Sequence, residues 1–165
     1  MPTRTGRIVA VCLNPDEGTR KFPQPRIQIG SHGIVGDHHN REMRPSFSKP
    51  GTFKPNTDRH ITIVAQEAFD FINTELGTSV TAGDFGENLL VQGLDDLSWV
   101  PDGATIKIGD HIELKVAEQN EPCRNLAVYH RLMVKTAYKR RGLLCSIQSG
   151  QGEWIHPLDA IAIET

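Results

Sequence analysis

The sequence predicts a mainly β protein whose strands close into one barrel, with one or two helices at its periphery. Short apolar runs rich in isoleucine and valine recur along the chain, and turn-forming residues separate them at regular intervals. The 165 residues include 15 glycines and 10 prolines, a composition that favours turns over long helices. Seven or eight strands with this spacing are typical of a β-barrel.

Three strands and one helix are predicted in the first half of the chain. Residues 6–14 (GRIVAVCLN) and 26–30 are short, β-branched and bounded by turn formers, as strands are. Residues 60–65 alternate isoleucine and valine with other residues, which predicts a third strand. The helix spans residues 66–76, where apolar residues form one stripe, and Gly77 supplies its C-terminal stop.

The second half is predicted to supply the remaining strands. Residues 83–93 (GDFGENLLVQG) form a turn and a short strand, and residues 104–116 alternate on both sides of a Gly-Asp turn, as a hairpin does. Residues 126–139 are compatible with a helix, and residues 143–148 and 158–163 form a last pair of strands. Because no linker separates these elements, we expect a single domain over residues 1–165.

Residues 41–59 are predicted to form a long loop. They contain three prolines and only three large apolar residues, Met43, Phe47 and Phe53. Loops of this length are usually functional or disordered.

The overall composition excludes several classes of protein. The chain is 38% hydrophobic and 23% charged with a net charge of −2, so it offers no general attraction to nucleic acid or to an anionic membrane. The longest early apolar run, residues 8–13, is too short for a signal sequence or a membrane span. The three cysteines form no CxxC pair and no even disulfide framework, which favours a reducing cytoplasm.

Charge is unevenly distributed along the chain. Residues 1–65 hold ten basic residues against five acidic ones, and residues 66–122 reverse this with two against twelve. Residues 124–141 then carry six basic residues and no acid: Arg124, Arg131, Lys135, Lys139, Arg140 and Arg141. A segment of one sign indicates a local anion site. For most of these six residues, a solvated basic helix face is the simpler explanation.

Cys123 is the strongest candidate for chemistry. Pro122 interrupts the preceding strand, which predicts a thiol on a loop, and Arg124 is a permanent cation one residue away. A neighbouring cation lowers the pKa of a thiol and favours the thiolate, which is the nucleophile and the metal ligand. Cys12 and Cys145 lie inside strand patterns and fit the commoner fate of a buried, inert cysteine.

A second cluster combines Asp37, His38 and His39 with His60 further along the chain. Histidine and aspartate bind divalent metals, so a metal-dependent hydrolase using Asp37, His38 and His60 is one alternative function. Adjacent histidines on a strand point in opposite directions, however, and no HxxxH or HExxH spacing is present. Hydrogen-bonded loop histidines are the simpler explanation.

Taken in order, six segments resemble the MOSC domain family, which is named for the C-terminal domain of molybdenum cofactor sulfurases. Each segment alone is a short motif, but their order and spacing around one cysteine would rarely arise by chance. The segments are GIVGDHH (33–39), RHITIVAQEAF (59–69), AGDFGENLLVQGL (82–94), ATIKIGDHIEL (104–114), EPCRNL (121–126) and RRGLLCSIQSG (140–150).

The resemblance implies a MOSC-type closed barrel that binds the molybdenum cofactor, a pterin with a phosphate tail and a dithiolene that holds molybdenum. It implies that Cys123 binds the molybdenum or carries sulfur as a persulfide. The basic residues implied for the anionic cofactor are Arg124, Arg140 and Arg141. Asp37 and His39 match the family's GDxH phrase. Glu87 and Asn88 match its GENL phrase, although such a pair at a turn more often bonds local backbone.

The resemblance also implies partner proteins. The chain contains no cysteine desulfurase region and hence no pyridoxal phosphate site, so this cofactor is expected only in a partner cysteine desulfurase that would supply sulfur. Molybdenum-dependent reduction would instead require an electron-donor protein. Because the 41–59 loop leaves the barrel directly after the GDHH turn, we expect it to close over the cofactor. A non-enzymatic module that binds an anion or nucleic acid through residues 124–141 is a further alternative. For the cofactor-binding reading itself, neither nucleic acid nor a membrane is an expected partner.

Overall fold

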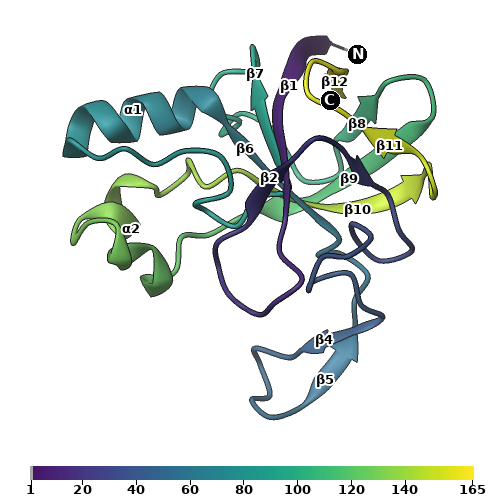
Figure 1. Ribbon diagram of the computed structural model, residues 1–165, viewed down its shortest axis with the longest axis horizontal. Coiled ribbons are helices and arrows are strands. Elements are labelled where there is room, and N and C mark those ends of the chain that lie inside the picture. The colour runs from purple at the N-terminus through teal and green to yellow at the C-terminus, as the bar shows by residue number, and fades with distance from the viewer. Residues whose placement is uncertain (1) are drawn as a thin grey trace.

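The computed structural model describes residues 2–165 and has a closed barrel of seven strands at its centre (Figure 1). Around the barrel the order is β12–β8–β9–β10–β6–β7–β1, and β1 pairs with β12 to close it. All neighbours are antiparallel except β6 and β7, which are parallel. The strands are β1 (Thr3–Leu13), β6 (Ile61–Ala65), β7 (Leu89–Gln92), β8 (Thr105–Ile108), β9 (Ile112–Gln119), β10 (Leu143–Ser149) and β12 (Ala160–Glu164).

Smaller elements surround the barrel. Strand β2 (Phe22–Gln24) extends the sheet beside β1, and β3 (Ile27–Gln28) pairs with β11 (Trp154–Ile155). The helices are α1 (Gln66–Leu76), the 3-10 helix η1 (Arg124–Val128) and α2 (Met133–Thr136). The predicted mainly β barrel with peripheral helices is therefore confirmed. No helix within residues 2–165 is long and apolar enough to cross a membrane.

Two apolar cores hold the molecule together. The first fills the barrel, where the alternation of β9 buries Ile112, Leu114 and Val116. Each such side chain contributes about 1.5–3 kcal/mol by leaving water. The second core lies between the barrel and the helices, where Phe69 of α1 packs edge-on against Phe85 with ring centroids 5.0 Å apart. Leu126 and Met133 belong to this second core, which therefore fixes η1 and α2 against the barrel.

The predicted helix over residues 66–76 is confirmed, including its C-terminal stop. The backbone of Gly77 is left-handed, with φ of 66°, and its N–H donates to the carbonyl of Asn73. This conformation favours glycine because a Cβ would be strained there.

The prediction of one continuous helix over residues 126–139 is wrong. Residues 124–128 and 133–136 form two separate helical pieces, and turns connect them. Between the two pieces, the ring Nδ1 of His130 accepts a hydrogen bond from the N–H of Leu132, 3.0 Å away. A side chain that bonds local backbone in this way competes with the helical pattern.

The prediction of a loop over residues 41–59 is wrong in part, because this segment contains a two-stranded hairpin. Strand β4 (Met43–Pro45) pairs with β5 (Phe53–Pro55), and we call residues 42–58 the arm. The arm projects away from the barrel in Figure 1. Its prolines concealed the hairpin in the sequence, but an isolated two-stranded ribbon tolerates proline because it has two edges.

Candidate functional site

A cleft of about 600 Å³ lies where several loops and the arm meet the barrel wall. Its lining comes from residues 17–21, 39–47, 56–62, 85–88, 120–125, and 141 and 144. A smaller hollow of about 350 Å³ lies between the end of α1 and Tyr129, and it contains no cysteine, lysine or arginine. The larger cleft is therefore the candidate site.

Cys123 lines this cleft immediately before η1 and is partly exposed. Burial alone would raise the pKa of its thiol, but the backbone N–H of Asn125 and the guanidinium of Arg141 stabilise the thiolate, so that the pKa is lowered. Cys12 and Cys145 are buried, and burial raises the pKa of Cys12 to about 12 and also raises that of Cys145. Cys123 is thus the one accessible thiol among the three and the one whose pKa is lowered.

Arg141 also connects the cysteine segment to the neighbouring loop. Its guanidinium donates to the carbonyls of Glu121, at 2.9 Å, and Phe85, at 3.4 Å. The next residue, Gly142, passes so close to the barrel that an added Cβ would lie 1.8 Å from the carbonyl oxygen of Ile63. Only glycine fits this close approach, and it allows Arg141 to reach the cleft.

The other two basic residues predicted for the cofactor lie elsewhere. Arg124 is exposed on η1 and does not line the cleft, and the cation that lowers the pKa of Cys123 is Arg141. The guanidinium of Arg140 lies 3.9 Å from the ring centroid of Phe71 on α1 and donates to the carbonyl of Thr136. Adjacency in sequence therefore did not identify the cation that acts on the thiol.

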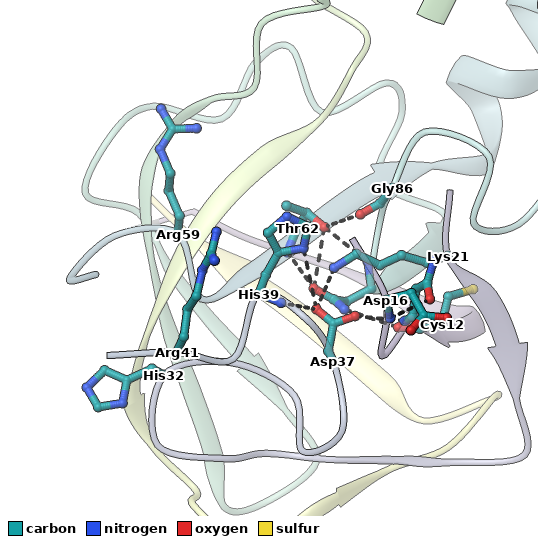
Figure 2. Close-up of polar contacts among 12 residues, drawn as sticks. Cys12, Asp16, Lys21, His32, Asp37, His39, Arg41, Arg59, Thr62 and Gly86 are labelled. Atoms are coloured by element: carbon teal, nitrogen blue, oxygen red, sulfur yellow. Dashed lines mark hydrogen bonds and ion pairs between the residues drawn. The ribbon is translucent and has the colours of Figure 1, made fainter. Parts of the chain in front are cut away.

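Asp37 and His39 occupy different environments in the GDHH turn. The carboxylate of Asp37 is buried and accepts hydrogen bonds from Nζ of Lys21, at 2.7 Å, and from the N–H of Asn14, at 2.8 Å (Figure 2). Burial would raise the pKa of Asp37, but His39, Lys21 and Asn14 together lower it. His39 is exposed and lines the cleft, with Nδ1 3.7 Å from the Asp37 carboxylate. Asp37 thus positions the turn, whereas His39 faces the cleft.

Lys21 had no recognisable signal in the sequence, yet its side chain is only 2% exposed. Backbone packing explains the glycines opposite it. A Cβ on Gly83 would lie 1.9 Å from the carbonyl oxygen of Lys21, and one on Gly86 would lie 2.4 Å from that of Thr19. The glycines in the GDFG phrase therefore allow the Lys21 segment to lie against the barrel.

Glu87 and Asn88 both bond backbone, but only Glu87 bonds the local backbone that such a pair at a turn was expected to bond, whereas Asn88 joins two distant strands. Asn88 accepts from the N–H of Thr62, at 3.2 Å, and donates to the carbonyl of Cys12, at 3.1 Å, while it also lines the cleft. Glu87 is fully buried, which raises its pKa to about 8, and one oxygen accepts from the N–H of Phe85. Its other oxygen has no hydrogen-bond partner within residues 2–165.

The residues that a metal-dependent hydrolase would use, Asp37, His38 and His60, do not form a metal site. Both ring nitrogens of His60 are used by backbone, since Nε2 bonds the carbonyl of Asn56 at 2.7 Å and Nδ1 accepts from the N–H of Ile147 at 3.0 Å. Asp37 is paired with Lys21, and His38 does not line the cleft. Within the described chain, no three His, Cys, Asp or Glu side chains are grouped to hold a metal ion.

Three arginines on the cleft were not singled out from the sequence. Arg41, Arg44 and Arg59 come from the arm and its two ends. Arg44 pairs with Asp58 at 3.2 Å and Arg59 with Glu118 at 3.0 Å, whereas Arg41 forms no ion pair with any described residue. Figure 2 shows the side chains of Arg41 and Arg59 extending in the same direction. The basic excess of residues 1–65 was the available signal, but nothing local placed it beside Cys123.

The structure thus combines a closed barrel with a partly exposed thiol in a cleft that four arginines line. The family model for the MOSC domain matches residues 36–161, and the chain belongs to the MOSC domain family. This family is associated with the molybdenum cofactor. No curated protein sequence matches the chain.

Solved structures share the fold. The YuaD protein from Bacillus subtilis is 20% identical with a TM-score of 0.87, over 98% of this chain and 97% of that one. YiiM from Geobacillus stearothermophilus is 21% identical with a TM-score of 0.71, over 99% of this chain and 76% of that one. YiiM from Escherichia coli is 17% identical with a TM-score of 0.66, over 96% of this chain and 70% of that one.

Proposed function

We propose that the chain binds the molybdenum cofactor in this cleft, with the Cys123 thiolate as its metal ligand. The observation that carries the proposal is the partly exposed thiol whose pKa is lowered by Arg141 and the Asn125 N–H. A thiolate is a soft ligand and suits a metal that is already held by dithiolene sulfur. When bound, the cofactor would supply the redox chemistry of its metal.

The arginines fit the anionic part of the same cofactor. Guanidinium groups present a planar fork of donors that matches phosphate oxygens. Arg41 has no carboxylate partner among the described residues, and Arg44 and Arg59 each have one on a side chain that is partly exposed. We assign phosphate binding to these three residues, with His39 beside them, in place of a strip that ends at Arg140 and Arg141.

Two roles follow from this proposal, and each requires a partner. As a sulfur carrier, Cys123 would hold a persulfide supplied by a cysteine desulfurase. As the cofactor-binding part of a molybdenum-dependent oxidoreductase, the chain would receive electrons from a donor protein. The opening of the cleft to solvent beside Cys123 suits either role, because a partner must reach the thiol or the bound cofactor.

Expression in a host that makes the molybdenum cofactor tests the proposal. We expect the purified parent to contain molybdenum by elemental analysis and pterin by fluorescence after oxidation. Cys123→Ala should lose molybdenum, whereas Cys145→Ala, which removes a thiol from the barrel core, should retain it. Equal metal content in the parent and Cys123→Ala would exclude Cys123 as the ligand. Phosphate binding without any pterin would favour the simple anion-binding module.

A further inference from the structure

Phe47 is an exposed aromatic ring on the wall of the cleft. It lies on the loop between β4 and β5, and 75% of its surface is exposed. The other phenylalanine of the lining, Phe85, is 1% exposed because it belongs to the second core. Exposed apolar surface inside a ligand cleft is a common feature of binding sites, where it is covered by the ligand.

Two cations lie near this ring. The guanidinium carbon of Arg59 lies 5.1 Å from the ring centroid, and that of Arg44 lies 6.0 Å away. Both guanidiniums are held by carboxylates, Glu118 for Arg59 and Asp58 for Arg44. Phe47 is therefore close to two arginines, of which Arg59 is the more exposed, while most of the ring's own surface remains free.

The loop that carries Phe47 is ordered by its own hydrogen bonds. The N–H of Ser46 donates to the carbonyl of Thr52 at 2.9 Å, and the hydroxyl of Ser46 accepts from the N–H of Lys49 at 3.3 Å. Asn56 then ties the arm to its surroundings, because its amide donates to the carbonyl of Arg41 and accepts from the N–H of Arg59, both at 3.1 Å. The backbone that carries Phe47 is therefore ordered before binding, so a ligand that covers the ring does not also have to order the loop.

We propose that Phe47 is a stacking platform for the planar heteroaromatic ring of an anionic ligand, whose charged group is received by the adjacent arginines. An aromatic side chain beside cationic groups is the arrangement by which proteins bind nucleobase-like rings. The ring could come from the pterin of the cofactor or from a separate heteroaromatic substrate. Identifying the ring as the pterin rests on the proposed function, whereas the role of Phe47 as a stacking platform does not.

Titration calorimetry on cofactor-free protein tests this with three probes: inorganic phosphate, pterin-6-carboxylate and adenosine monophosphate. We expect Phe47→Ala to weaken the affinity for one or both ring-bearing probes about tenfold, the effect of losing one stacked ring. Phosphate should bind Phe47→Ala and the parent equally, and Phe47→Trp should retain ring binding. Loss confined to the pterin probe assigns the platform to the cofactor, and loss for adenosine monophosphate assigns it to a separate substrate.

Phe53→Ala is the matched control, because Phe53 is a 61% exposed phenylalanine on the same arm that does not line the cleft. Unchanged ring binding in Phe47→Ala, an equal loss in Phe53→Ala, or a parent that binds neither ring would overturn the platform. The molybdenum content tests the proposed function separately. A chain without molybdenum that still shows the Phe47 effect would refute cofactor binding and keep the platform.

Discussion

Strands β8 and β9 direct only aliphatic side chains into the barrel. The wall of the cleft, on the same barrel, instead contains buried Lys21, and buried Asp37 and Glu87 lie next to it. In the barrel, stability is spread over many similar contacts, and each contributes a modest amount. At the cleft, a few buried polar groups depend on single partners. Substitutions of similar size should therefore have very different effects in the two regions.

The largest effect is expected at the buried ion pair. Lys21→Met leaves the Asp37 carboxylate buried without its cation, which should destabilise the protein by about 3–5 kcal/mol in urea unfolding. Lys107→Met is the matched control, because the Lys107–Glu164 pair is exposed and should contribute at most about 1 kcal/mol. Ile106→Val in the barrel should cost about 0.5–1.5 kcal/mol. Similar losses for Lys21→Met and Ile106→Val would remove the distinction between the two regions.

Glu87 should give the next largest effect, and it appears as a pH dependence. Its pKa is raised from 4.5 to about 8 in the folded protein, so the folded state keeps a proton that the unfolded state loses above pH 4.5. Stability should therefore fall as the pH rises from 4.5 to 8, by roughly a few kcal/mol. Glu87→Gln keeps the shape without the titration and should flatten this part of the profile.

Urea unfolding of Glu87→Gln between pH 5 and pH 8 measures this dependence. Glu75→Gln, at the exposed end of α1, is the control and should leave the parent's profile unchanged. A profile of Glu87→Gln that falls as steeply as the parent's would show that other groups cause the loss.

The barrel could be predicted from the sequence because its information is local. In residues 104–116 each apolar residue faces the core and each polar neighbour faces out, so the alternation alone specifies β8 and β9. The helix at 66–76 and its stop at Gly77 follow from equally local patterns. The prediction failed where a side chain overrode the periodicity, as His130 does between η1 and α2.

The cleft could be predicted only in part, because its contacts join residues far apart in the chain. Pro122 indicated a loop at Cys123, and the structure places that thiol on the cleft. The cation that acts on it is Arg141, not the adjacent Arg124, and no local pattern reports this contact. Lys21 likewise meets Asp37 sixteen residues away. Such pairings are set by the closed barrel and not by neighbouring residues.

The smallest expected effect is on the reactivity of Cys123 and not on the stability of the protein. Because Arg141 helps to lower the pKa of this thiol, Arg141→Gln should move the pH profile of its alkylation by iodoacetamide to higher pH. Arg141→Lys keeps the positive charge and should return the alkylation profile part of the way toward that of the parent. If Arg141 acted only through its two hydrogen bonds to carbonyls, lysine would not bring the profile back. Mass spectrometry of the labelled peptide measures the rate at Cys123 alone.

Arg124→Gln is the control that decides between the two arginines. Its side chain is exposed and outside the cleft, so its removal should leave the alkylation profile in place. If Arg124→Gln shifts the profile as far as Arg141→Gln does, sequence neighbours control the thiol and the cleft geometry does not. If only Arg141→Gln shifts it, the reactivity of Cys123 depends on a contact that exists only after the barrel has closed.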